Sequence, residues 1–182
     1  MNLPNKLTIL RVIMIPFFVA ALLYDGGANQ NMRYVAAALF IIASLTDMLD
    51  GKIARKYNLV TNFGKFMDPL ADKLLVSAAM ICMIELGMLP AWVVIIIISR
   101  EFIITGFRLI AAEGGLVIAA SWWGKIKTTV QMVMSVFLIV NFDGKVVNIV
   151  ENVLIYAAIL LTVISLVDYL VKNWNVLDDG KM

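Results

Sequence analysis

The sequence lacks histidine altogether and contains one cysteine among its 182 residues. Without histidine there is no imidazole base, no Ser-His catalytic pair and no His-rich zinc site, so any proton transfer must use Asp, Glu, Lys, Cys or Tyr. The lone cysteine, Cys82, excludes an intramolecular disulfide, and we expect it to be a small buried apolar residue. Charge is also scarce, since charged residues make up 15% of the chain and hydrophobic residues 62%. This balance predicts an integral membrane protein.

Long apolar stretches fill nearly the whole chain. A helix that spans a bilayer needs roughly 17–25 apolar residues. Stretches of this length cover about 7–24, 34–53, 69–89, 91–112, 126–142 and 146–171. We therefore predict an all-α integral membrane protein whose six transmembrane helices form a single domain over residues 1–182. The first stretch resembles a signal peptide, but its length, Pro16 and the following DGGANQNM favour a true span.

The basic residues predict an orientation in the plasma membrane. Loops on the cytoplasmic side are enriched in Lys and Arg. With the amino terminus inside, all of the fifteen Lys and Arg residues except Arg33 and Lys145 fall on the inner side or in the inner halves of the helices. Both termini are therefore predicted to be cytoplasmic, and the basic side faces the anionic inner leaflet.

Four aspartates, Asp47, Asp50, Asp68 and Asp72, stand at the ends of apolar stretches. A carboxylate at the centre of a spanning helix costs about 2.5–3.5 kcal/mol, so four of them need a common compensation. Spacings of three and four place each pair on one face of its helix. The short connection KYNLVTNFGKF predicts that the two helices are antiparallel neighbours, with the pairs meeting at their cytoplasmic ends. Such oxygen ligands select Mg²⁺ or Mn²⁺, and the sequence predicts a site for two cations.

Residues next to the aspartates fit a phosphate-bearing ligand. Gly51 and Ala54 leave room for a ligand to approach the helix, and Arg55 supplies a fixed cation for a phosphate. Carboxylate-held metals, a steric gap and an arginine are what a pyrophosphate needs. Gly64 is expected to end the turn between the two helices.

Simpler interpretations exist for single members of this set. Asp68 before Pro69 is also typical of a helix N-cap with proline at the first helical position. Asp47 and Asp50 are also placed to form structural ion pairs with basic residues nearby. Separate caps and ion pairs do not explain two same-face pairs on either side of one short loop.

The full pattern, D-x2-D-G-x2-A-R-x8-G-x3-D-x3-D from Asp47 to Asp72, resembles the signature of the CDP-alcohol phosphotransferases. The stretches NKLTILR, SREFIITGFRLIAAEGG and SWWGKIKTTVQM are similar to the phosphatidylglycerophosphate synthases within that family. The resemblance implies a six-helix membrane fold, two bound Mg²⁺ or Mn²⁺ ions and a homodimer. It also implies transfer of a phosphatidyl group from CDP-diacylglycerol to sn-glycerol 3-phosphate, with release of CMP.

The resemblance also implies roles for individual residues. The metal ligands are Asp47, Asp50, Asp68 and Asp72, and Asp72 is in addition the general base. The residues implied to bind CDP-diacylglycerol are Asn5, Thr8, Gly51, Arg55 and Thr61.

Basic residues later in the chain suggest where the acceptor's phosphate binds. Arg100 and Arg108 are eight apart, roughly two turns on one helical face, and Lys125 and Lys127 begin the next apolar stretch. We predict that these four residues bind the phosphate and that Glu101 orients Arg100 or Arg108. The alternative, favoured for Lys127, is attachment to the anionic inner leaflet.

The residues favour direct transfer, because every well-placed nucleophile is an aspartate already assigned to the metals. A carboxylate beside the metals then takes the proton of the attacking hydroxyl. Within the same family, inositol phosphate, serine or phosphatidylglycerol are alternative acceptors. From another class, a divalent-cation transporter also uses intramembrane carboxylates. A purely structural membrane subunit gives no reason for the four aspartates.

Overall fold

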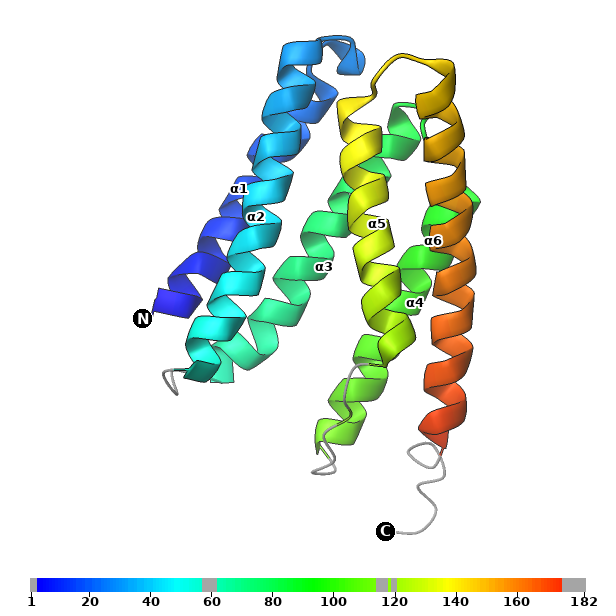
Figure 1. The fold of residues 1–182 in the computed structure, drawn as a ribbon. Coiled ribbons are helices and arrows are strands. Elements are labelled where there is room, and N and C mark those ends of the chain that lie inside the picture. The colour runs from blue at the N-terminus through cyan, green and yellow to red at the C-terminus, as the bar shows by residue number, and fades with distance from the viewer. Residues whose placement is uncertain (1–2, 57–61, 114–117, 119–120, 175–182) are drawn as a thin grey trace. The chain divides into compact units, whose positions relative to one another are not determined.

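The computed structural model describes residues 3–56, 62–113, 118 and 121–174, with side chains outside the description at 3–4, 47–56, 62–66, 68–69 and 112–113. Among the described residues all regular structure is helical, as predicted (Figure 1). The elements are α1 (Leu3–Leu23), the 3₁₀ helix η1 (Tyr24–Gly27), α2 (Gln30–Lys56), α3 (Asn62–Glu85), α4 (Ala91–Glu113), α5 (Trp122–Val140) and α6 (Lys145–Lys172).

Each predicted apolar stretch has its own helix, but several helices extend into polar sequence. The clearest case is α3, which begins at Asn62 rather than near residue 69. Gly64 therefore lies inside α3, and the prediction that it ends a turn is wrong. Asp68 also lies well inside α3, so its interpretation as an N-cap is wrong. A helix satisfies its own backbone hydrogen bonds whatever its side chains are, so it does not have to end where the apolar run ends.

The described chain forms two compact units. Unit 1 comprises Met1–Pro90 with Ser135–Phe142, and unit 2 comprises Ala91–Met134 with Asp143–Met182. The single domain predicted from the sequence stays a prediction. Each unit is described by itself below.

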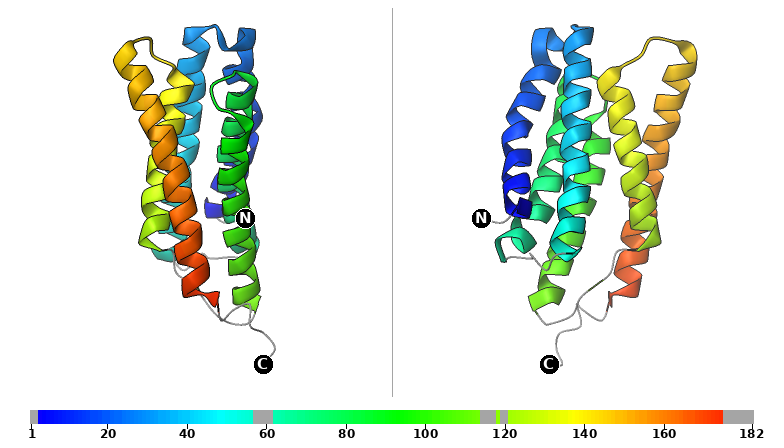
Figure 2. Two further views of the ribbon diagram at one scale, coloured as in Figure 1. Left: turned by 90° about the vertical axis from the view of Figure 1, so that its right-hand side faces the viewer. Right: turned by 60° about the vertical axis from the view of Figure 1, so that its left-hand side comes forward.

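In unit 1, α1 packs against both α2 and α3 (Figures 1 and 2). Phe18 of α1 and Phe40 of α2 are buried against each other, with ring centroids 5.8 Å apart. Buried alanines on these helices, such as Ala36 of α2 and Ala79 of α3, are small enough to let helix backbones approach closely. The helices α2 and α3 are also in contact and run antiparallel, as predicted for the two helices that carry the aspartates.

Arg33 links three parts of unit 1. It is buried near the start of α2, and its Nε donates to the carbonyl of Gly27 in η1 at 2.5 Å. Its Nη1 reaches the carbonyls of Ile139 at 3.3 Å and Leu138 at 3.5 Å, both in the last turn of α5. Carbonyls at the end of a helix have no partner within it, and a cation there is favourable. Arg33 therefore caps the carboxyl end of α5 and does not face solvent.

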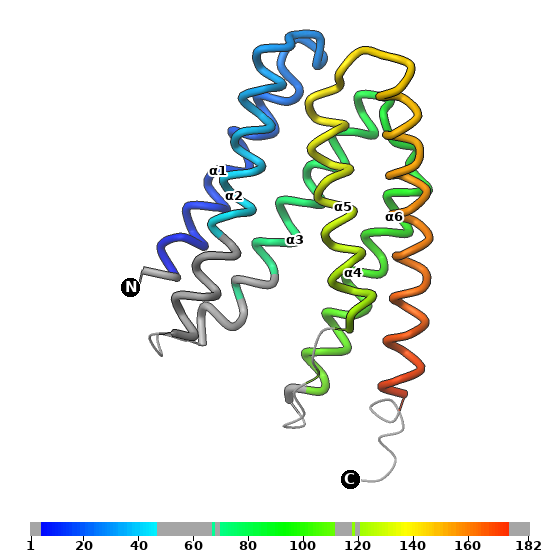
Figure 3. The backbone as a smooth tube through the Cα atoms, in the orientation of Figure 1, coloured from blue at the N-terminus to red at the C-terminus, as the bar shows by residue number. Residues whose placement is uncertain are grey.

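In unit 2, α4 and α6 lie side by side (Figure 3). Ile104 and Phe107 of α4 form a buried core with Tyr169 of α6. The rings of Phe107 and Tyr169 meet edge to face, with centroids 6.1 Å apart and an interplanar angle of 85°. This contact fixes the Tyr169 ring between the two helices.

In α6 the polar side chains are buried and the large apolar ones are exposed, the opposite of a helix in a soluble protein. Its buried residues are Ala158, Thr162, Ser165 and Tyr169. Its exposed face carries the large apolar residues Val146, Ile149, Val153, Tyr156, Leu160, Val163, Val167 and Val171. An apolar outer face with polar side chains inside is typical of a helix surrounded by lipid. Within the described residues, two helices are long and apolar enough to cross a membrane, Asn5–Gly27 and Lys145–Lys172. The six spans stay a prediction.

Candidate active site

The predicted acidic pairs belong to two neighbouring helices of unit 1. Asp47 and Asp50 lie in α2, and Asp68 and Asp72 lie in α3. The helical spacing places each pair on one side of its helix. Asp72 is partly buried, and the side chains of the other three lie outside the described residues.

The donor chemistry of this region fits Mg²⁺ or Mn²⁺. Carboxylates from two contacting antiparallel helices supply the oxygen ligands that hard divalent cations prefer. Gly51 and Arg55 follow Asp50 on the same helix, so the predicted ligand-binding residues continue from the acidic pair. Thr61, also predicted to bind CDP-diacylglycerol, lies outside the described residues.

On α1, Asn5, Thr8 and Arg11 are all buried in unit 1. Arg11 is completely buried, and its Nε donates to the carbonyl of Ala43 in α2 at 3.2 Å. Ala43 lies one helical turn before Asp47, so the Arg11 guanidinium contacts the backbone of α2 about one turn before the acidic motif. From the sequence, Arg11 was predicted only to belong to the basic inner side, and its contact with α2 was not predicted. The available signal was the regular three-residue spacing of Asn5, Thr8 and Arg11 in an apolar helix.

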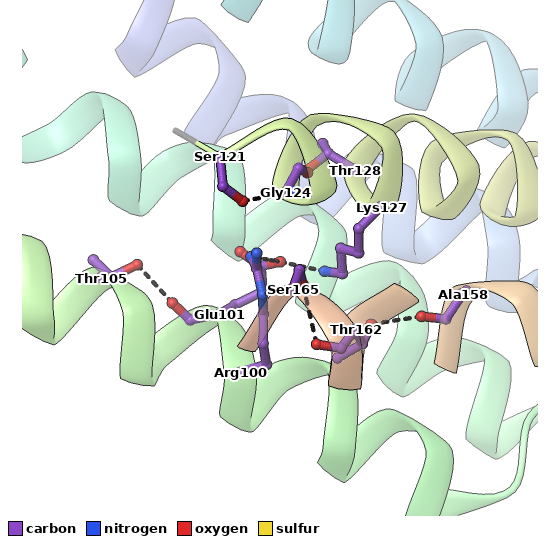
Figure 4. A network of polar contacts seen from close by, with 10 residues as sticks. All are labelled: Arg100, Glu101, Thr105, Ser121, Gly124, Lys127, Thr128, Ala158, Thr162 and Ser165. Atoms are coloured by element: carbon purple, nitrogen blue, oxygen red, sulfur yellow. Dashed lines mark hydrogen bonds and ion pairs between the residues drawn. The ribbon is translucent and has the colours of Figure 1, made fainter. Parts of the chain in front are cut away.

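In unit 2, side chains from α4, α5 and α6 meet in one polar cluster, shown in Figure 4. Arg100 Nη1 lies 3.2 Å from Oε1 of Glu101, and Lys127 Nζ binds the same oxygen. Arg100 Nε donates to Ser165 Oγ at 3.1 Å. These four residues are called the Arg100 cluster below. The predicted contact between Glu101 and Arg100 is confirmed.

Lys127 and Arg100 are both buried, with 0% and 7% of their surface exposed. A fully buried ammonium group that binds Glu101 cannot also reach lipid head groups, so attachment of Lys127 to the leaflet is wrong. Gly124 brings the backbone of α5 close to this site, because a Cβ there would lie 3.2 Å from Arg100 Nη2. Ser121 Oγ accepts the Gly124 N–H at 3.1 Å and caps the start of α5.

Ser165 is oriented by its own helix. Its hydroxyl donates to the carbonyl of Thr162 at 3.0 Å, so its oxygen lone pair is available to accept from Arg100. Thr162 donates in turn to the carbonyl of Ala158 at 2.6 Å. These bonds fix the side of α6 that faces the Arg100 cluster (Figure 4). Sequence reasoning missed Ser165, because a serine in an apolar span carries no distinctive signal.

Arg108 and Lys125, the other two residues predicted to bind the phosphate, lie in different surroundings. The Arg108 guanidinium lies over the Tyr169 ring, 5.8 Å from its centroid, and is close enough to Arg100 for an electrostatic interaction. Lys125 Nζ instead lies over the Trp122 ring at 5.4 Å, where both residues are exposed. An exposed lysine beside a tryptophan is typical of a membrane interface. This contact favours the membrane-surface interpretation for Lys125.

The charges of this region suit a dianion. Arg100, Lys127 and Arg108 carry three positive charges, and Glu101 is the carboxylate that contacts two of them. Arg100 and Lys127 are buried whereas Arg108 is exposed, and buried like charges are unfavourable unless an anion balances them. Glu101 balances one of the two buried positive charges, and a phosphate monoester supplies further negative charge that guanidinium groups bind through paired hydrogen bonds.

Comparison with known proteins gives a consistent result over the whole chain. A family model described as CDP-alcohol phosphatidyltransferase matches residues 1–164. A Bacillus subtilis protein named CDP-diacylglycerol--glycerol-3-phosphate 3-phosphatidyltransferase is 48% identical, over 97% of each chain. A Haemophilus influenzae protein of the same name is 41% identical, over 98% of this chain and 97% of its own. A probable phosphatidylglycerophosphate synthase of Mycobacterium tuberculosis is 46% identical, over 94% of this chain and 81% of its own.

Proposed function

Because the chain belongs to the CDP-alcohol phosphatidyltransferase family, we propose that it transfers the phosphatidyl group of CDP-diacylglycerol to sn-glycerol 3-phosphate. The products are phosphatidylglycerophosphate and CMP, in phospholipid biosynthesis. The names of the relatives support this enzyme over a cation transporter and over family members with other acceptors.

The observation that carries the choice of acceptor is the buried Arg100 cluster with Arg108 beside it. Its positive charges exceed its carboxylate charge, which favours an acceptor that bears a phosphate over serine or an uncharged alcohol. Arg100, Lys127 and Arg108 bind the phosphate of glycerol 3-phosphate, and Glu101 holds the first two in place. Lys125 was predicted to belong to this group, and its contact with Trp122 supports a place at the membrane surface instead.

The acidic pairs of α2 and α3 provide the reaction centre. Asp47, Asp50, Asp68 and Asp72 hold two divalent cations, Mg²⁺ or Mn²⁺. When bound, these cations neutralise the pyrophosphate of CDP-diacylglycerol and stabilise the departing CMP. The CDP group is bound by Asn5, Thr8, Gly51, Arg55 and Thr61.

The proton of the attacking hydroxyl passes to a carboxylate. With histidine absent from the sequence, Asp72 acts as the general base for the acceptor hydroxyl. The acceptor oxygen forms its bond to the phosphorus of the phosphatidyl group as the bond to the CMP oxygen breaks. The transfer is direct and has no covalent enzyme intermediate, because the aspartates are already committed to cations and proton transfer.

The enzyme works as a multi-pass protein of the plasma membrane. The apolar outer face of α6 supports lipid contact, and we assign both termini and the acidic pairs to the cytoplasmic side. Two copies form a homodimer, as the resemblance implies. Light scattering of the protein in detergent micelles tests this by giving the molar mass of the protein component.

An acceptor panel tests the function. Purified protein is supplied with CDP-diacylglycerol and Mg²⁺, and CMP release is measured with glycerol 3-phosphate, inositol phosphate, serine or phosphatidylglycerol. The proposal expects release to depend on glycerol 3-phosphate and expects phosphatidylglycerophosphate as the lipid product. Faster release with another acceptor would assign the chain to a different branch of the family.

A further inference from the structure

The hydroxyl of Tyr169, like Asp168 Oδ2, is a buried polar atom of unit 2 without a hydrogen-bond partner among the described residues. Tyr169 is 2% exposed, and among the described residues its hydroxyl oxygen is buried without a hydrogen-bond partner. A buried hydroxyl that makes no hydrogen bond destabilises the fold, and most such groups in proteins are satisfied. An orphaned hydroxyl in a packed core therefore indicates a partner that binds there.

The neighbours of Tyr169 place its side chain close to the Arg100 cluster and to Arg108. Tyr169 follows Ser165 by one turn on the buried face of α6, and Ser165 binds Arg100. Phe107 meets the Tyr169 ring edge to face, and Arg108 lies over the ring. Tyr169 thus contacts Arg108 and lies one helical turn from the serine that binds Arg100.

We propose that Tyr169 binds the phosphate of the acceptor, donating its O–H to a phosphate oxygen beside Arg100 and Arg108. This inference rests on the proposed function and adds a phosphate-binding residue that no sequence pattern singles out. The neighbouring arginines cannot accept the hydroxyl proton, whereas a phosphate oxygen can accept it while also accepting from the arginines. A neutral hydroxyl next to them adds a hydrogen bond without adding a further positive charge. The hydroxyl therefore adds a hydrogen bond at less electrostatic cost than a second buried arginine beside Arg100.

The test is Tyr169→Phe, which keeps the ring contacts and removes only the hydroxyl. The full-length variant is assayed in phospholipid nanodiscs. We expect the KM for glycerol 3-phosphate to rise about tenfold or more, since the lost hydrogen bond is to a charged group. The KM for CDP-diacylglycerol and kcat should change less than about twofold. The melting temperature without acceptor should stay the same or rise, because an unsatisfied buried hydroxyl has been removed.

Tyr156→Phe is the matched control, since Tyr156 lies on the exposed face of α6 with 68% of its surface accessible. It should leave both KM values unchanged. An unchanged acceptor KM in Tyr169→Phe overturns the inference. A lower melting temperature, or equal increases in both KM values, also overturns it, because these results indicate a structural hydroxyl. If the wild-type protein itself shows no dependence on glycerol 3-phosphate, the proposed function has failed instead.

Discussion

Lys127 and Glu101 form an ion pair between α5 and α4 in which the ammonium group is fully buried. The same Glu101 oxygen contacts Arg100, so one carboxylate holds two buried cations. Glu101→Gln would leave both cations without their anion. We expect a loss of about 3–5 kcal/mol in the free energy of unfolding, which is typical when one partner of a buried pair is removed. Thermal unfolding in a mild detergent measures the effect.

Asp168→Asn provides the comparison for Glu101→Gln. Asp168 pairs with Lys172 at 2.6 Å, but the Lys172 side chain is 64% exposed. Water and salt screen such a pair, so the variant should lose less than about 1 kcal/mol. Equal losses in the two variants would contradict a special role for the buried pair.

Arg100→Gln separates the binding of glycerol 3-phosphate from the binding of CDP-diacylglycerol. The variant removes a guanidinium that we assign to the phosphate of glycerol 3-phosphate but keeps a polar side chain near Ser165 and Glu101. The KM for glycerol 3-phosphate should rise by about tenfold or more, because a charge-assisted hydrogen bond is lost. The KM for CDP-diacylglycerol should change far less. Lys145→Gln, at the exposed start of α6, is the control for lost positive charge.

Arg33→Met tests the hydrogen bonds that Arg33 makes to the carbonyls at the end of α5. Methionine keeps much of the side-chain length but cannot donate to Gly27, Leu138 or Ile139. Unsatisfied buried carbonyls cost about 1–3 kcal/mol, so the melting temperature should fall. The kinetic constants of the folded protein should remain close to wild type. A change in either KM without a change in stability would show that Arg33 acts on the reaction instead.

Asp72→Asn tests the general base. The amide keeps the size of the carboxylate but cannot take a proton, so kcat should fall by about 100- to 10,000-fold. The KM for glycerol 3-phosphate should change little, because its phosphate binds elsewhere. Asp25→Asn is the control, since Asp25 is exposed and has a φ of 52°, which asparagine adopts readily. A kcat for Asp72→Asn within a few-fold of wild type would assign the base to another residue.

The sequence predicts the helices well because apolar runs of spanning length have few alternatives. It misplaces the start of α3, because charged and polar residues interrupt the apolar ones in NFGKFMD, and hydropathy detects only the part of a helix that is surrounded by lipid. The backbone stays helical beyond that part, which puts Gly64 inside the helix.

The sequence predicts the acidic motif by spacing, because i, i+3 and i, i+4 neighbours share a helical face. It fails for contacts made across helices. Lys127 looks like a leaflet anchor until Glu101, twenty-six residues away, is seen beside it. Arg11 and Tyr169 look like ordinary parts of membrane spans, and only their burial and partners in the folded chain distinguish them.

The central claim is that the aspartates of α2 and α3 form one site for divalent cations. Titration of the purified protein with Mn²⁺, followed by electron paramagnetic resonance, tests this directly and does not depend on activity. We predict about two bound Mn²⁺ per chain, displaced by Mg²⁺, and loss of this binding in an Asp47→Asn, Asp68→Asn double variant that still folds. The same Mn²⁺ binding in that double variant and in the wild-type protein would contradict the claim.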